Sequence, residues 1–286
     1  MQKTLSALVT YLALDKQDAR IETHLLLQHV LQVNRAWLIS HADDTLTPEQ
    51  YAAFGALLQR RVEGEPIAHI LGSREFFGLN LIVTADTLIP RPDTETLVEA
   101  ALEKTTHFTQ ALKILDLGTG TGAIALAIAK HCPQANVTAV DFSESALNIA
   151  RENAKNLAIP NASFVHSHWF SALNNQQFDL IVSNPPYIAE NDPHLSQGDV
   201  RFEPKSALTS GADGLDGIRH IIGQASQHLA PNGWLLLEHG YDQAEAVAKL
   251  MAEAGFTEIA HAQDLAGIQR VTFGMVSPMI STKFPE

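Results

Sequence analysis

The alternation of strands and helices from about residue 111 onward limits the fold of this chain more than any other feature. Short apolar runs, such as 112–117 and 178–183, are typical of buried strands, and helical patterns separate them. This order predicts a mostly parallel sheet with helices on both faces, an α/β fold. The expected strands are 112–117, 135–140, 162–165, 178–183 and 234–238, the expected helices are 123–130, 143–157, 217–229 and 242–254, and two last strands near 256–260 and 269–276 would form a hairpin.

The first 73 residues have a helical pattern instead. Leu25, Leu26 and Val30 recur at helical spacing. Thr47-Pro48-Glu49-Gln50 predicts a helix start, because threonine can cap, proline suits the first turn and glutamine completes a capping box. That helix would carry one apolar stripe made of Tyr51, Phe54, Leu57 and Leu58. These helices either dock a partner or only pack on the rest of the chain.

A change of pattern at residue 74 suggests the domain organisation. Residues 74–90 contain two short apolar runs about Gly78 and predict a β-hairpin linker. The segment IPRPDTE at 89–95 is either a rigid connection or the lining of a site, with Arg91 as its polar contact and Asp93 as a helix N-cap. We expect a helical, substrate-docking domain over 1–73, the linker over 74–90 and a catalytic domain over 91–286.

A glycine-rich loop, Gly118-Thr119-Gly120-Thr121-Gly122, connects the first expected strand to a helix. Glycines at this junction allow a tight turn and let a ligand approach the backbone closely. Asp141 ends the next strand, where a carboxylate can accept hydrogen bonds from the ribose hydroxyls of an adenosine cofactor. The loop and Asp141 together predict a cofactor site.

The loop favours S-adenosylmethionine over a dinucleotide. Dinucleotide sites use Gly-x-Gly-x-x-Gly, whereas the third glycine here comes one residue early. Asp116, which precedes the loop, would repel a phosphate. Trp169 follows the third strand, where it could stack on an adenine ring; a core or surface tryptophan is the alternative.

The tetrapeptide Asn184-Pro185-Pro186-Tyr187 follows the fourth strand. The prolines lack backbone N–H groups and end the strand, so Asn184 stands at its carboxyl end, where open α/β sheets bind ligands. The Asn184 side-chain oxygen and the Pro185 carbonyl are two acceptors that can hold both hydrogens of an –NH₂ group. Tyr187 could cover the flat face of that group. A proline-terminated turn without a ligand is the alternative.

Composition and charge restrict the partners and the compartment. The formal net charge is −13 and the longest basic cluster is Arg60-Arg61, which disfavours binding to bare nucleic acid but leaves a local basic groove open. Cys132 is the one cysteine, which excludes an intramolecular disulfide and fits a reducing cytoplasm. We expect no signal peptide and no membrane span, because no apolar run has the required length. His166 and His168 lack a nearby third ligand, so no metal site is expected.

Several motifs resemble one family of Rossmann-like methyltransferases. The tetrapeptide at 184–187 is shared with enzymes that methylate amino groups of DNA adenine, ribosomal-RNA guanine and protein glutamine. Together with the helical N-terminal region, the other motifs are similar to those of the release factor glutamine methyltransferases, the HemK/PrmC family, over nearly the whole chain. They are GSREFFG at 72–78, IPRPDTE at 89–95, EP at 203–204, AL at 207–208 and GADGL at 211–215.

That resemblance implies a specific reaction. The substrate would be the glutamine of the Gly-Gly-Gln loop in class-1 peptide chain release factors, and the product would be N5-methylglutamine. The family's cofactor contacts correspond to 118–122, Asp141, Trp169 and Asn184, and its substrate amide site corresponds to 184–187. His168 stands where the family has an acid that helps to hold the adenine amine.

Three other functions remain open from the sequence. An amino-group methyltransferase acting on ribosomal RNA or DNA bases would use the same tetrapeptide, but the acidic charge disfavours it. A nicotinamide-dependent oxidoreductase would use the glycine loop. A non-catalytic adaptor would use only the helical region, and the intact tetrapeptide at 184–187 disfavours it.

Overall fold

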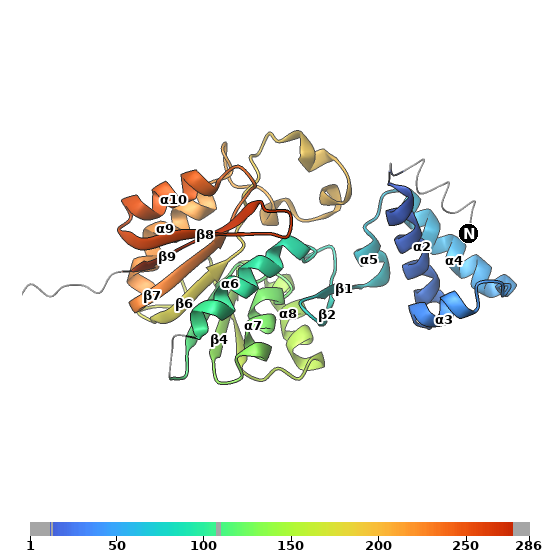
Figure 1. Cartoon of the computed structure of the whole chain (residues 1–286), viewed down its shortest axis with the longest axis horizontal. Helices are drawn as coiled ribbons and strands as arrows, with labels where there is room; N and C mark the ends of the chain where they lie inside the picture. Colours follow the sequence, from blue (N-terminus) through green and yellow to red (C-terminus); the bar gives the residue numbers. More distant parts are fainter. Residues whose placement is uncertain (1–11, 13, 107–109, 277–286) are drawn as a thin grey trace, which may run out of the picture. The chain divides into compact units, whose positions relative to one another are not determined.

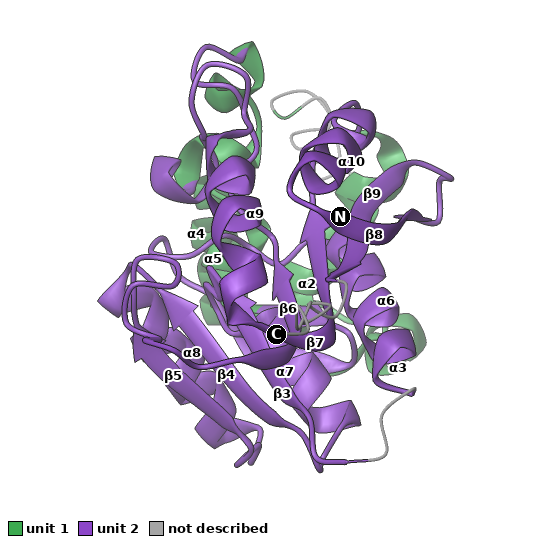
Figure 2. Cartoon of the chain, turned by 90° about the vertical axis from the view of Figure 1, so that its left-hand side faces the viewer, with its two compact units in different colours: residues 1–73, 193–202 green, residues 74–192, 203–286 purple. Residues whose placement is uncertain are grey.

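The computed structural model describes residues 12, 14–106 and 110–276, and the chain divides into two compact units (Figure 1). The helical unit comprises 1–73 and 193–202, and the catalytic unit comprises 74–192 and 203–286 (Figure 2). Residues 1–11 of the expected helical domain and 277–286 of the expected catalytic domain lie outside the described residues. Two details differ from the sequence interpretation: the hairpin groups with the catalytic unit, and the segment 193–202 groups with the helical unit.

The helical unit contains α2 (Lys16–Leu31), α3 (Arg35–Ser40), α4 (Pro48–Val62) and α5 (Ile67–Leu71). The predicted capping box at the start of α4 is confirmed. Thr47 Oγ1 accepts from the backbone N–H of Gln50 at 3.2 Å, and Gln50 Oε1 accepts from the N–H of Thr47 at 2.9 Å. The predicted apolar stripe is partly wrong. Phe54 is buried with Leu26 and Ile70, whereas Tyr51, in the first turn, lies beyond this small core and is 70% exposed.

A buried arginine explains why the segment 193–202 groups with the helices. The Arg61 side chain donates to both carboxylate oxygens of Glu22 at 2.8 and 3.1 Å and to Asp199 Oδ1 at 3.0 Å. Asp199 begins the short 3₁₀ helix η3 (Asp199–Phe202), which follows η2 (Pro193–Ser196). Because a buried cation needs paired anions, Arg61 joins this distant segment to α2 and α4.

The predicted hairpin is present as β1 (Ser73–Phe76) and β2 (Leu79–Ile82). Phe77 and Gly78 connect the strands with positive φ values of 48° and 72°, as a two-residue hairpin turn requires. Leu79 and Leu81 are fully buried in a core cluster of the catalytic unit. The hairpin is therefore packed on the catalytic unit and is not a free linker.

A seven-stranded sheet forms the centre of the catalytic unit. Its strands are β3 (Lys113–Leu117), β4 (Asn136–Asp141), β5 (Ala162–His166), β6 (Phe178–Ser183), β7 (Leu229–Glu238), β8 (Phe256–Gln263) and β9 (Gln269–Val276). They lie in the order β5-β4-β3-β6-β7-β9-β8. The first five are parallel, and β9 runs antiparallel to both of its neighbours. The predicted parallel sheet and terminal hairpin are confirmed.

Helices cover both faces of this sheet (Figure 1). They are α6 (Glu95–Thr105), α7 (Ala123–His131), α8 (Glu144–Asn156), α9 (Asp216–His228) and α10 (Ala244–Glu253). Successive residues of β3 point to opposite faces: Ile114 joins a cluster with α6 and α7, and Leu115 joins one with α9 and α10. No helix in the described part of the chain is long and apolar enough to cross a membrane.

The start of α6 differs from the prediction. Asp93 does not cap this helix, because the 3₁₀ turn η1 (Pro92–Thr94) precedes it and the Asp93 carboxylate pairs with Arg270 at 2.9 Å. The ion pair with β9 competes with capping for the same carboxylate. The Asp93 carboxylate therefore links η1 to β9 and does not cap α6.

Candidate active site

The register of the parallel strands gathers the predicted site residues at one edge of the sheet. Leu117 pairs with Val140 on one side and with Ser183 on the other. Ser183 in turn pairs with Leu237. The strand order reverses between β3 and β6, which is where open α/β sheets bind ligands. The residues that follow the four paired positions therefore lie in a row: Asp141, Gly118, Asn184 and Glu238.

A cavity of about 450 Å³ opens at this edge. It is lined by Ala85, Asp86, Thr87, Leu88, Gly118, Gly120, Asp141, Phe142, Ser143, Ser145, Ala146, Ser167, His168, Trp169, Asn184, Pro186, Pro204, Ser206 and Ala207. Five of the predicted cofactor contacts are in this lining, whereas Thr119, Thr121 and Gly122 are not. Of the tetrapeptide, Asn184 and Pro186 line the cavity.

The glycine loop needs its glycines for conformation. Gly118, Gly120 and Gly122 all have positive φ, at 74°, 54° and 83°. A Cβ on Gly122 would also lie 3.1 Å from a Leu126 methyl group, so this glycine permits close packing of the loop on α7. The side chains of Thr119 and Thr121 are buried, so these residues support the loop from below.

Asp141 holds the loop as well as lining the cavity. Its Oδ2 accepts from the backbone N–H of Gly120 at 2.8 Å, and its Oδ1 accepts from that of Ser143 at 2.8 Å. Burial raises the pKa of the carboxyl, while these backbone hydrogen bonds lower it. The carboxylate is thus fixed beside the glycines by two donors and faces the cavity, as ribose binding requires.

Asp116 lies under the loop and is fully buried. Its Oδ2 accepts from Thr119 Oγ1 at 2.6 Å, whereas Oδ1 finds no hydrogen-bond partner among the described residues. Burial raises the pKa of this carboxyl to about 7. No lysine or arginine occurs in the cavity lining given above. These features suit a cationic, phosphate-free ligand and do not suit a dinucleotide.

Ionisation of Asp116 is expected to make the ligand-free protein less stable as pH rises. The folded-state pKa is about 7 and the unfolded value is 3.8, so the folded state holds the proton more tightly. The free energy of unfolding should therefore fall by about 1 kcal/mol between pH 6 and pH 8 from this group. Thermal melts of the wild type and Asp116→Asn at both pH values measure it. A wild-type pH effect that Asp116→Asn leaves unchanged would contradict the assignment.

Trp169 and His168 form an aromatic rim on the cavity. Trp169 has a positive φ of 52°, and its ring lies 3.7 Å from the position of a Cβ built on Gly118. His168 meets the exposed Phe142 and His220 edge-on, with ring centroids 5.7 Å apart in both pairs. Trp169 is thus next to the glycine loop, as adenine stacking requires, and the imidazole of His168 lies beside it.

Glu203, a buried glutamate, links two chain segments that line the cavity. Glu203 accepts from the backbone N–H of Ile89 at 2.9 Å and pairs with Arg91. Arg91 therefore does not line the cavity, contrary to one sequence interpretation. Glu203 instead anchors the segment 85–92 to the segment 203–207, and both segments contribute to the cavity lining.

The Asn184 side chain is held in one orientation. Its Nδ2 donates to Thr94 Oγ1 at 3.1 Å, and Thr94 is buried. The amide oxygen of Asn184 is therefore directed away from Thr94, on a residue that lines the cavity. This arrangement leaves the amide oxygen of Asn184 as a hydrogen-bond acceptor on a residue of the cavity lining.

Tyr187 has a different environment from the one expected. Its ring packs against the core cluster of α9 and α10, and its hydroxyl lies near the Glu238 carboxyl, whose pKa it lowers. Burial raises the Tyr187 pKa well above its usual value. Glu238 and Thr94 are not among the site residues that the sequence predicts. An acid at the end of a strand, the pattern recognised at Asp141, could have identified Glu238, whereas nothing in the local sequence singles out Thr94.

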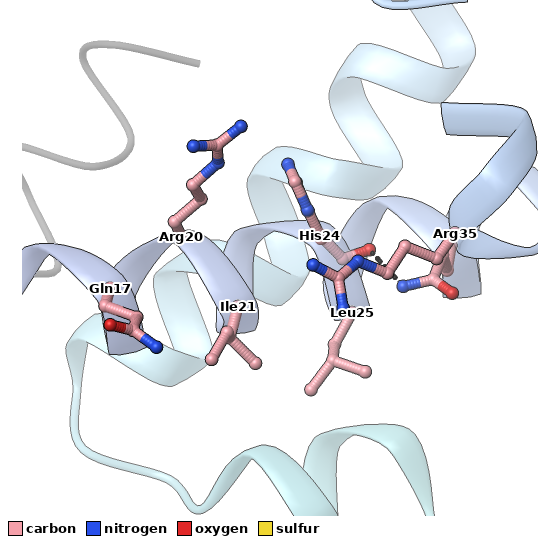
Figure 3. Close-up of a pocket in the computed structure, with 7 residues that line it drawn as sticks. Gln17, Arg20, Ile21, His24, Leu25 and Arg35 are labelled. Atoms are coloured by element: carbon pink, nitrogen blue, oxygen red, sulfur yellow. Dashed lines mark hydrogen bonds between the residues drawn. The ribbon is translucent and has the colours of Figure 1, made fainter. Parts of the chain in front are cut away.

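A second pocket, of about 520 Å³, lies in the helical unit along α2 (Figure 3). It is lined by Gln17, Arg20, Ile21, His24, Leu25, Gln28 and Arg35. Burial and the two arginines lower the pKa of His24. This pocket shares no residue with the site described above. No group of three or more potential metal ligands occurs in the described ranges.

Comparisons with known proteins agree with this architecture. A family described as "Methyltransferase small domain" matches residues 93–201, and one described as "PrmC N-terminal domain" matches residues 6–72. A solved methyltransferase from Pyrococcus furiosus is similar in fold, with a TM-score of 0.52 and 18% identity, over 77% of this chain and 97% of that chain.

Two curated relatives are similar over most of their length. The release factor glutamine methyltransferase of Xylella fastidiosa is 50% identical over 89% of this chain and 92% of its own length. That of Vibrio cholerae is 53% identical over 89% of this chain and 88% of its own length. By this degree of identity and coverage, the chain belongs to the family of release factor glutamine methyltransferases.

Proposed function

We propose that this chain methylates the side-chain amide nitrogen, N5, of the glutamine in the Gly-Gly-Gln motif of class-1 peptide chain release factors. S-adenosylmethionine is the methyl donor. The family supports this substrate, and one observation carries it: Asn184 donates to Thr94 and so keeps its oxygen as an acceptor at the cavity. The reaction takes place in the cytoplasm, without direct contact to nucleic acid or membrane, and residues 1–73 dock the release factor.

The residues of the cavity fit this cofactor. The glycine backbone at 118–122 admits a ligand closely, Asp141 offers acceptors for ribose hydroxyls, and Trp169 offers a ring for stacking. The Oδ1 atom of Asp116, which has no hydrogen-bond partner among the described residues, places a further acceptor beneath the loop. When bound, the cofactor supplies a methyl group activated by a sulfonium.

The protein's main contribution is to position the substrate amide. An amide nitrogen is a poor nucleophile because its lone pair is delocalised into the carbonyl. Asn184 Oδ1 and the Pro185 carbonyl each accept one hydrogen of the substrate –NH₂ group, which fixes the direction of its nitrogen. Positive charge develops on that nitrogen during the reaction, and the same two acceptors stabilise it. No general base is obvious in the cavity, and the methylated nitrogen loses its extra proton to solvent after methyl transfer.

A substrate panel with a labelled methyl donor tests the proposal. Unmethylated release factor, purified ribosomal RNA and DNA are each incubated with the full chain, and nicotinamide-cofactor binding is measured by calorimetry. The release factor is expected to take up label, the nucleic acids to take up none, and the nicotinamide cofactor to show no binding. Labelled RNA or DNA with an unlabelled release factor would replace this function with amino-group methylation of bases.

A further inference from the structure

The carboxyl of Glu238 lies beside the substrate-binding tetrapeptide without belonging to it. Glu238 is the last residue of β7, and the preceding residue, Leu237, pairs with Ser183, which precedes Asn184. Glu238 is only 1% exposed. Burial of an unpaired acid is unfavourable. A carboxylate buried at the end of the strand next to Asn184 must therefore have partners that stabilise it.

Hydroxyl groups surround this carboxyl. The hydroxyls of Thr94 and Tyr187 lie near enough to this carboxyl to lower its pKa, while Oε2 has no hydrogen-bond partner among the described residues. The charged neighbours are Arg270 and Asp93, which pair with each other at 2.9 Å. Burial raises the pKa of Glu238 to about 7, and the two hydroxyls and Arg270 oppose this shift. Glu238 therefore contacts Tyr187 directly and reaches Asn184 through Thr94.

The direction of these hydrogen bonds follows from a count of protons. A threonine hydroxyl has one proton to donate, and the ionised form of Glu238, which predominates above its pKa of about 7, can only accept. If Thr94 gives its proton to Glu238, then Thr94 Oγ1 can only accept from Asn184. The two ends of an asparagine amide are similar in shape, so packing alone does not decide which end faces Thr94. The Glu238 carboxylate determines which end of the Asn184 amide faces Thr94.

The alternative orientation would be unproductive. With a donor in place of the carboxylate, Thr94 could donate to the Asn184 oxygen, and the amide would turn over. Asn184 would then present its –NH₂ group to the –NH₂ group of the substrate, and two donors do not bind each other. Few other partners are available to the Thr94 hydroxyl, because the residue is only 4% exposed.

We propose that Glu238 is a positioning residue that, through Thr94, sets the orientation of the Asn184 amide and so keeps its oxygen directed at the substrate. This inference deepens the proposed function and rests on it. The same carboxylate fixes the Tyr187 hydroxyl, so it holds both ends of the tetrapeptide 184–187. Glu238 does not contact the substrate. It acts by keeping the amide oxygen of Asn184, and not the amide nitrogen, directed at the substrate.

The first test is Glu238→Gln, which preserves shape but introduces a donor. At saturating cofactor and release factor, the turnover number is expected to fall about 10- to 100-fold, as for loss of one or two net hydrogen bonds. The cofactor dissociation constant and the melting temperature should stay near the wild-type values, because an amide replaces a buried acid. Wild-type turnover in Glu238→Gln would overturn the proposal while leaving the proposed function intact.

Substitutions at Thr94 separate positioning from simple packing. Thr94→Val, which keeps the shape and removes the hydroxyl, is expected to lose about as much turnover as Glu238→Gln, and Thr94→Ser is expected to retain activity. The double variant Glu238→Gln/Thr94→Val should be no slower than either single variant, because both remove the same connection. Multiplied losses in the double variant would indicate two independent packing roles and contradict the proposal.

A structural readout makes the test independent of the substrate. In full-length protein with ¹⁵N-labelled asparagine, the side-chain amide protons of Asn184 should show a nuclear Overhauser effect to the Thr94 methyl group. Glu238→Gln should weaken it, since the amide turns over. Its absence in the wild type, or an unchanged effect in Glu238→Gln, would refute the connection even if the substrate were not a release factor.

Discussion

Replacement of Asn184 by alanine is expected to lower the turnover number by about 10²- to 10³-fold, the range measured when an enzyme loses one transition-state hydrogen bond. The substitution removes the acceptor that aims the substrate nitrogen and stabilises its developing charge. It leaves the glycine loop, Asp141 and Trp169 in place, so the cofactor dissociation constant should change only a few-fold. Single-turnover rates with unmethylated release factor, together with calorimetry of cofactor binding, measure the two quantities separately.

Asn175→Ala is the matched control, because it removes the same side chain from an exposed position outside the cavity lining. It should leave both quantities unchanged. Asn184→Ala with near-normal turnover would show that the tetrapeptide does not hold the reacting amide. An equal loss of cofactor affinity and turnover would show instead that Asn184 acts mainly on the cofactor.

Asp141→Asn is expected to weaken cofactor binding by about 10- to 100-fold, because hydrogen bonds to a charged acceptor contribute about 1.5–3 kcal/mol. An asparagine has one acceptor oxygen where the carboxylate has two. It would also loosen the loop, because Asp141 holds the N–H groups of Gly120 and Ser143. Titration calorimetry with S-adenosylmethionine measures the effect without the protein substrate.

The control for this change is Asp86→Asn, which removes the same charge from another residue of the cavity lining. Its carboxylate does not hold the glycine loop; the Asp86 N–H bonds to Thr84 Oγ1 in the chain beside it. Only a small loss of affinity is expected. If the two variants lose affinity equally, the effect comes from the overall charge of the cavity, and the specific role of Asp141 is wrong.

Much of the fold could be predicted because local patterns and their ends agree. The strand 178–183 matches the structure at both bounds, since the prolines after Asn184 must end it. The cofactor loop was recognisable because glycines with positive φ stand between a strand and a helix. Asn184 and Asp141 meet at one edge because both end parallel strands, and their strand positions were evident from the sequence.

The remaining features depend on contacts between distant residues. The grouping of 193–202 with the helices follows from Arg61, which bonds to Asp199 far along the chain. Asp93 has the residue type and position of a helix cap, yet its carboxylate pairs with Arg270 of β9. The connection from Glu238 through Thr94 depends on sheet register and on the packing of η1. Local residue preferences contain none of this information.

The most direct measurement is to locate the methyl group on the product. Unmethylated release factor, made in cells that lack this activity, is incubated with the full chain and S-adenosylmethionine, and its peptides are mapped by mass spectrometry. A release factor with glutamate in place of the Gly-Gly-Gln glutamine serves as the control. One added methyl group on that glutamine, and none on the glutamate variant, is the predicted result. Methylation at another residue, or none with cofactor binding confirmed, would contradict the assigned substrate.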